Sequence, residues 1–181
     1  MKRMVAAVVG MVCLLTATGC GTFYETSPST YKKALKYIDY PEYFPESLDG
    51  YTINRYAFTR YEYMDTCVEV FVELTVDSEQ LQTLLLLARQ AEGMLFERSA
   101  YYAQGYQEIV FSDSYQLHED VERVGNADIR KVIYNERNGN VIYEYFDAFD
   151  TGVYELKDLA YFNRFAIDQQ EYSVYITEEK A

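Results

Sequence analysis

The clearest pattern of hydrophobic and polar positions in the chain lies at residues 67–76. Val68, Val70, Val72, Leu74 and Val76 alternate there with Cys67, Glu69, Phe71, Glu73 and Thr75. Successive side chains of a β-strand point to opposite faces of its sheet. We therefore predict an antiparallel strand whose aliphatic face lies on a core and whose other, mostly polar face lies toward solvent.

Directly after this strand the hydrophobic spacing becomes helical. The apolar stripe consists of Leu81, Leu84, Leu85 and Ala88. Asp77 or Ser78 can cap the start of a helix, because their side chains accept hydrogen bonds from first-turn amides. Leu86 and Leu87 widen the stripe, so we predict a heavily buried helix that ends near Gly93.

A β-hairpin is predicted around the dipeptide Asn138-Gly139. Its two strands would be residues 130–137 and 140–146. Both central residues of a type I′ turn need a positive φ, which Asn and Gly adopt readily. A two-residue turn at this dipeptide would place Tyr134 opposite Tyr143.

Weaker patterns fill the rest of the chain. They predict a short helix over residues 31–38, strands over 51–64, 107–112 and 172–176, a loop over 98–105, and a helix or strand within 153–167. Strands joined by short turns form antiparallel sheets, and a long apolar helix can cover one face. The predicted fold class is therefore α+β: a single antiparallel sheet of four to six strands, with helices packed on one face.

The first twenty residues have the layout of an export signal. Lys2 and Arg3 are followed by an uncharged apolar run over residues 4–15. This run is too short for a membrane-spanning helix, which needs about 20 residues. Small residues then precede a cysteine in Ala17-Thr18-Gly19-Cys20. In this arrangement the chain resembles the signal of bacterial lipoprotein precursors.

The resemblance implies a diacylglyceryl thioether on Cys20, cleavage between Gly19 and Cys20, and a possible N-acyl chain. The alternative interpretation is an ordinary secretory signal, which would leave Cys20 as a free thiol. Two or three acyl chains anchor a protein stably, since each buried methylene contributes about 0.8 kcal/mol. The expected location is the outer face of the plasma membrane in a monoderm, or the outer membrane in a diderm. The expected organisation is a signal peptide (1–19), a flexible tether (20–30) and one acidic, Tyr-rich domain (31–181).

Composition restricts the partners of this domain. The formal net charge is −13, and it becomes more negative when Lys2 and Arg3 leave with the signal. Nucleic-acid binding needs Lys and Arg to neutralise phosphates, so we expect no nucleic-acid partner. Attachment to anionic lipid by charge is disfavoured too, so the acyl chains on Cys20 would contact the membrane alone. The chain also contains 20 Tyr and no Trp, which suits either a binding platform or half-buried sheet positions.

The inventory of reactive side chains is small. His118 is the one histidine, and the acidic neighbour Glu69 would suppress the thiolate of Cys67. Asp147 and Asp150 lack the ligand spacing of a calcium loop. We therefore predict no catalytic, cofactor-binding or metal-binding residue, no cofactor, and a role that is not enzymatic.

The predicted function is that of a lipid-anchored lipoprotein of the cell envelope. Its exported domain would act as a binding or assembly module for another envelope protein. The alternative is a small envelope hydrolase that uses paired carboxylates, since a chain with 29 acidic residues offers many such pairs.

Replacing Cys20 tests the anchor. We expect Cys20→Ser to release a folded, soluble protein, because the acidic domain has no basic patch that would hold it on lipid. Fractionation of cells into membrane and soluble parts measures this. If the mature Cys20→Ser protein still fractionates with membranes, either the lipid assignment is wrong or a protein partner holds the domain there.

Overall fold

The computed structural model describes residues 21–39, 41–63, 65–100, 103–117, 123–148, 154–155 and 160. Its strands are β1 (Gly21–Glu25), β2 (Thr52–Tyr63), β3 (Asp65–Thr75), β4 (Phe96–Ser99), β5 (Gln107–Leu117), β6 (Arg123–Asn135), β7 (Asn140–Ala148) and β8 (Tyr154–Glu155). The helices are α2 (Tyr31–Ala34) and α3 (Ser78–Gln90), with short 3-10 helices η1 (Pro28–Thr30), η2 (Leu35–Tyr37) and η3 (Pro41–Tyr43). The predicted strand 172–176 lies outside the described residues.

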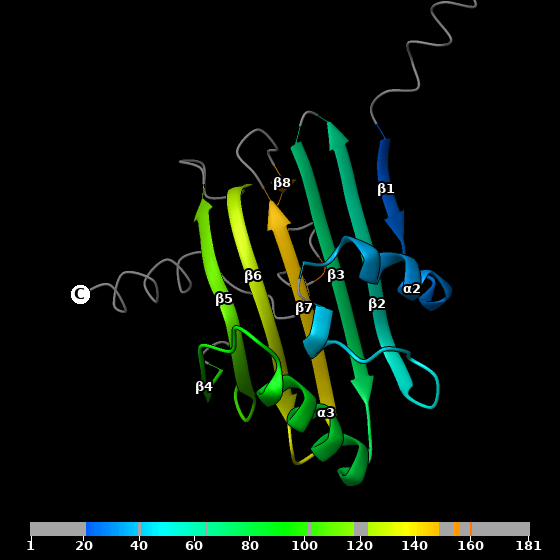
Figure 1. Cartoon of the computed structure of the whole chain (residues 1–181), viewed down its shortest axis with the longest axis vertical. Helices are drawn as coiled ribbons and strands as arrows, with labels where there is room; N and C mark the ends of the chain where they lie inside the picture. Colours follow the sequence, from blue (N-terminus) through cyan, green and yellow to red (C-terminus); the bar gives the residue numbers. More distant parts are fainter. Residues whose placement is uncertain are drawn as a thin grey trace, which may run out of the picture.

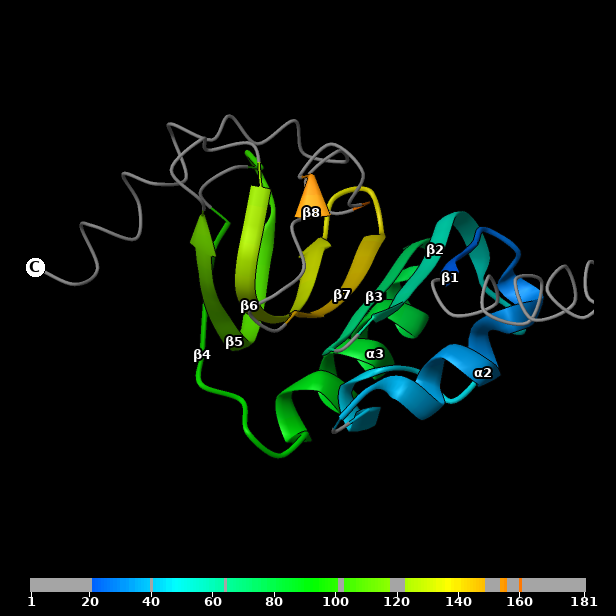
Figure 2. The ribbon, with the colours of Figure 1, turned by 90° about the horizontal axis from the view of Figure 1, so that it is seen from above.

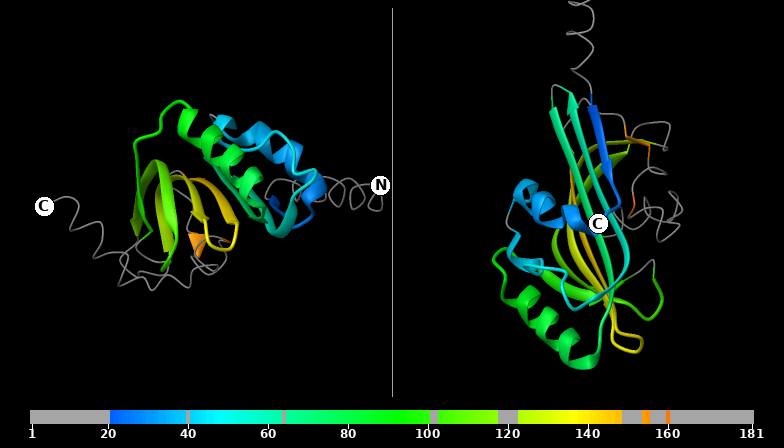
Figure 3. Two further views of the ribbon diagram at one scale, coloured as in Figure 1. Left: turned by 90° about the horizontal axis from the view of Figure 1, so that it is seen from below. Right: turned by 90° about the vertical axis from the view of Figure 1, so that its right-hand side faces the viewer.

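The strands form one antiparallel sheet in the order β1-β2-β3-β7-β6-β5-β4, and β8 pairs with β6 (Figure 1). Figure 2 shows that α2 and α3 lie on one side of this sheet and β8 on the other, and both views of Figure 3 agree. No helix among the described residues is long and apolar enough to cross a membrane.

The predicted fold class was wrong. The described chain is mostly sheet, with seven strands in the main path rather than four to six, and its two α-helices span only four and 13 residues. The main cause lies in the edge strands. β1 and β4 are short and have no alternating pattern, and β4 falls partly in the segment that we predicted to be a loop.

Strand β3 has the predicted alternation and lies in the middle of the sheet, between β2 and β7. Its aliphatic residues pack with the leucines of α3 in what we call the helical-side core. From β3, α3 and the residues that join them, this core contains Val68, Val70, Val72, Leu74, Val76, Leu81, Leu84, Leu85 and Ala88. Each fully buried Val or Leu side chain contributes about 1.5–3 kcal/mol, so this layer is a main source of stability.

Helix α3 begins where the sequence predicts. The side chain of Asp77 accepts hydrogen bonds from the amides of Glu79 and Gln80, and Gln80 bonds back to the Asp77 amide in a capping box. The expectation of heavy burial was wrong, however, because Leu86 and Leu87 are 55% and 37% exposed. They lie outside the narrow stripe that contacts the sheet.

The second face of the sheet is also buried, which the alternation in β3 did not predict. Residues of β3, β6 and β7 form a second core together with small residues from three other segments. This second core contains Ala57, Cys67, Phe71, Ala100, Ala103, Ala127, Ile129, Ile133, Ile142, Phe146, Ala148 and Ala160. The polar members of β3, Glu69 and Glu73, are therefore buried rather than solvated.

The β6–β7 hairpin exists, but its turn is longer than predicted. The last strand pair is Asn135 with Asn140, so four residues form the turn, and Tyr134 pairs with Val141 instead of Tyr143. The shift of two residues keeps every side chain on its expected face, because the side-chain period of a strand is two. Side-chain bonds from Asn135 to the Arg137 amide and from Asn138 to the Asn140 amide stabilise the longer turn.

Gly139 ties this turn to the start of α3. Its φ is +66°, its carbonyl accepts a hydrogen bond of 2.9 Å from the Val76 amide, and a Cβ at this position would lie 2.1 Å from the Val76 carbonyl oxygen. We expect Gly139→Ala to destabilise the domain by the cost of a left-handed Ala, about 1–2 kcal/mol, plus about 1–3 kcal/mol of overpacking.

Gly50→Ala is the matched control for this change. Gly50 has a φ of +84° but nothing within 4 Å of its Cβ position, so only the conformational cost applies. Urea unfolding of the mature chain carrying Cys20→Ser measures both variants. Equal losses of unfolding free energy would show that the Val76 carbonyl does not crowd a Cβ atom at position 139.

Candidate binding cavity

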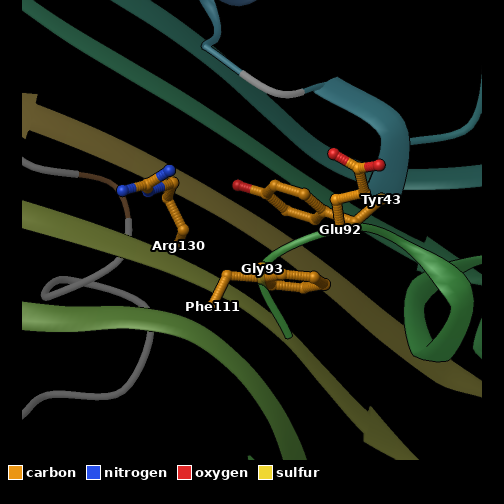
Figure 4. A pocket seen from close by; sticks show the side chains of 5 residues that line it. All are labelled: Tyr43, Glu92, Gly93, Phe111 and Arg130. Atoms are coloured by element: carbon orange, nitrogen blue, oxygen red, sulfur yellow. The ribbon is translucent and has the colours of Figure 1, made fainter. Parts of the chain in front are cut away.

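A cavity of about 240 Å³ opens on the helical side of the sheet. It is lined by Tyr43 of η3, Glu92 and Gly93 after the end of α3, Phe111 of β5 and Arg130 of β6. Figure 4 shows the aromatic rings of Tyr43 and Phe111 lying over one another. Their centroids are 4.3 Å apart in a stacked arrangement. The cavity thus combines an aromatic wall with one cationic and one anionic side chain.

Tyr43 is fixed by both ends of its side chain. Its ring also contacts Phe44, with centroids 4.7 Å apart, and its hydroxyl donates a hydrogen bond of 3.1 Å to the carbonyl of Glu144. Burial raises the pKa of Tyr43 well above its ordinary value, so the hydroxyl stays protonated. Tyr43, which is 1% exposed, is therefore a fixed and largely buried part of the cavity wall.

Arg130 is oriented by an acidic neighbour on its own strand. Its guanidinium donates two hydrogen bonds, of 2.7 and 2.6 Å, to the carboxylate of Asp128. Ser112 donates a third bond of 2.9 Å to the same carboxylate. Bidentate pairs of this kind restrict the arginine geometry, so Arg130 presents a positioned cation at the side of the cavity.

A second carboxylate lies beside this pair. Asp147 of β7 is directly opposite Asp128 of β6 in the strand register. Burial, followed by the charges of Asp128 and Asp39, raises the pKa of Asp147 above its ordinary value. The two acids therefore differ in environment: Asp128 is paired with Arg130, whereas Asp147 is disfavoured as an anion.

Charged side chains are also buried on the second face of the sheet. The ammonium of Lys131 lies 2.8 Å from Asp113 and 3.6 Å from Glu108. Arg98 of β4 contacts the same two carboxylates at 3.0 and 2.5 Å. This four-residue network, in which each carboxylate meets two cations, joins β4, β5 and β6 within the second core.

Glu144 of β7 is outside this network. It is fully buried, and neither of its carboxyl oxygens has a hydrogen-bond partner. Burial raises the pKa of Glu144 well above its ordinary value, and the nearby charge of Glu69 acts in the same direction, while Lys131 opposes both. An unpaired carboxylate is very costly in such a place, so burial favours the neutral acid form of Glu144 in the folded domain.

The residues that the sequence analysis discussed are not brought together. Cys20, His118 and Asp150 lie outside the described residues. Cys67 is buried on β3 in the second core, and Asp147 lies in the acidic pair described above. Among the described residues, no three His, Cys, Asp or Glu side chains are arranged to hold a metal ion.

Sequence reasoning missed the residues of the cavity and of the buried network. Tyr43 lies between Pro41 and Pro45, in a segment with no periodic hydrophobic pattern. In the sequence, Arg130 and Lys131 look like an ordinary pair of solvated cations. Glu144 gave one signal: it interrupts the apolar run Val141 to Phe146, which a doubly buried strand would otherwise continue.

Comparison of the chain with models of protein families, with curated proteins and with solved structures finds no match.

Glu144 makes stability depend on pH. Because its pKa is raised in the folded state, folding takes up a proton, and the unfolding free energy falls as pH rises above the ordinary value of 4.5. We expect Glu144→Gln to be more stable than the wild type at pH 8, because the glutamine side chain is neutral at every pH and needs no proton in the buried site. The difference should shrink at pH 4.

Urea unfolding of both proteins between pH 4 and pH 8 measures this difference. Glu136→Gln, in the exposed β6–β7 turn, removes one negative charge at a solvated position. If it stabilises the protein as much as Glu144→Gln does, the effect comes from net charge and not from burial.

Proposed function

We propose that the chain is a lipid-anchored lipoprotein of the cell envelope whose exported domain binds another envelope protein through the Tyr43–Phe111 cavity. The anchor is supported by the signal-like sequence that ends at Cys20. The binding role is supported by the cavity, which is the observation that carries the proposal. It combines a stacked aromatic wall, a positioned guanidinium and an exposed carboxylate in one place.

The size of the cavity indicates what it binds. Sites for drug-sized molecules and cofactors have volumes of roughly 300–1,000 Å³, whereas this one has about 240 Å³. That volume suits a single side chain of a partner protein. Glu92 and Arg130 offer opposite charges beside the aromatic wall, so a long basic or aromatic side chain fits its chemistry. A basic residue also complements the acidic domain.

The hydrolase alternative has one observation in its favour. Asp128 and Asp147 face each other across β6 and β7, and their environments differ in the way that an acid and its partner carboxylate require. Neither acid lines the cavity among its described residues, where Glu92 is the one carboxylate. The binding role is therefore the better supported of the two.

Site-specific photo-crosslinking in intact cells tests the binding role. A photoreactive residue replaces Gln90, which is exposed at the end of α3 close to the cavity, and captured proteins are identified by mass spectrometry. We expect one envelope protein to be enriched above a Cys20→Ala control. Glu92→Lys should reduce its yield at least several-fold, because it reverses the charge beside the aromatic wall.

Glu136→Lys is the matched control, since it makes the same charge change in the exposed β6–β7 turn. Its crosslinking yield should equal that of the parent. Recovery of no partner above the Cys20→Ala control, or equal loss of crosslinking in both charge variants, would contradict the role of the cavity.

A further inference from the structure

Strand β1 begins at Gly21, the residue that follows Cys20 in the sequence. Strand β1 pairs with β2 over its whole length, from Gly21 opposite Glu62 to Glu25 opposite Phe58. The segment that the sequence analysis assigned to a flexible tether thus contains an edge strand, and the 3-10 helix η1 follows it at Pro28. Strand β1 belongs to the same sheet as the other strands of the domain.

Side-chain contacts hold this segment in place. The ring of Phe23 packs edge-on against Phe58 at 5.4 Å and lies under the ammonium of Lys33 at 3.9 Å. Phe23 packs on the helical-side core as well. At the end of the segment, the Thr30 hydroxyl lies 3.1 Å from the Tyr56 hydroxyl. Backbone pairing and packing therefore both oppose release of the segment as a free linker.

We propose that no flexible linker separates the acyl anchor from the sheet. One end of the sheet then rests on the bilayer headgroups, and the strands extend away from the membrane. This rests on the proposed acylation of Cys20. One residue spans at most ~3.6 Å, whereas ten extended residues would reach ~33 Å or more. With β1 paired, the acylated residue is the direct neighbour of an ordered strand, and lipid and sheet cannot separate.

The strand register identifies the surface that faces the bilayer. The anchor end of the sheet comprises the start of β1, the end of β2 and the start of β3, which Figure 1 shows at the top of the molecule. The β6–β7 turn lies at the opposite end, beside the start of α3. β2 has 12 residues, so at about 3.3 Å per residue the two ends differ in height by roughly 35–40 Å.

The same register places the cavity close to the membrane. Arg130 pairs with Tyr145, and Tyr145 pairs with Val70, four residues along β3 from Thr66. Thr66 pairs with Glu62, which in turn pairs with Gly21. Four residues of strand correspond to about 13 Å. A partner that enters the cavity must therefore approach sideways within this height, as a protein held on the same bilayer does.

Energy transfer to labelled lipid measures the orientation. The acylated full-length mature protein is reconstituted into phosphatidylcholine vesicles that contain a headgroup-labelled acceptor lipid. A donor dye is attached at Asp65→Cys, at the anchor end, or at Asn138→Cys, at the far end, both with Cys67→Ala. We expect transfer at position 65 to exceed that at position 138 by several-fold. Ten Gly and Ser residues inserted between Cys20 and Gly21 should remove the difference.

A pair of neighbouring variants isolates the role of β1. Phe23→Ser removes the core contact of the strand, whereas Tyr24→Ser changes a residue that is 57% exposed. We expect the two transfer values to converge in Phe23→Ser and to stay apart in Tyr24→Ser. Equal transfer at both positions in the parent protein would overturn the proposal. The mass of the N-terminal peptide distinguishes failure of the acylation proposal from failure of the orientation proposal. An unacylated Cys20 refutes the lipid anchor itself. An acylated protein with equal transfer at both positions refutes only the fixed orientation.

Discussion

Burial of the central strands on both faces is the constraint on which the rest of the structure depends. In β3, Phe71 and Val72 point to opposite sides and neither is exposed, and the same holds for Tyr143 and Glu144 of β7. α3 and the segments around α2 cover one side, while the second core forms on the other. A sheet covered on both faces has no solvated side, so each polar residue on it must find a partner or lose its charge.

The domain meets this requirement in three different ways. On β4 to β6, two cations and two carboxylates neutralise one another, an arrangement in which the attraction offsets the cost of removing charges from water. On β7, Glu144 gives up its charge instead. Tyrosine solves the same problem on the helical side: Tyr31 and Tyr43 bury their rings and donate their hydroxyls to backbone carbonyls. At these two positions, packing in the core is enough to explain why the residue is tyrosine.

The parts of the fold that local pattern determines were predictable. The alternation in β3 and the capping residue Asp77 lie in the sequence itself, and both have the predicted structure. What covers the second face is decided by segments distant in the sequence, so the burial of Glu69 had no local signal. The turn at Gly139 was placed correctly but with the wrong length, because side-chain bonds from Asn135 extend it. The cavity was not predictable, since its five residues come from four separate segments.

If the chain is exported and acylated as proposed, the pairing of β1 has a consequence for the order of events. Acylation of Cys20 and cleavage before it would require enzymes to bind an extended, accessible segment of chain around that residue. β2, the partner of β1, follows it in the chain and would be exported later, and closing the two strands would remove that access. On the proposed lipidation, maturation must therefore be complete before the edge of the sheet closes. The later arrival of β2 would give the proposed processing enzymes the time in which to act.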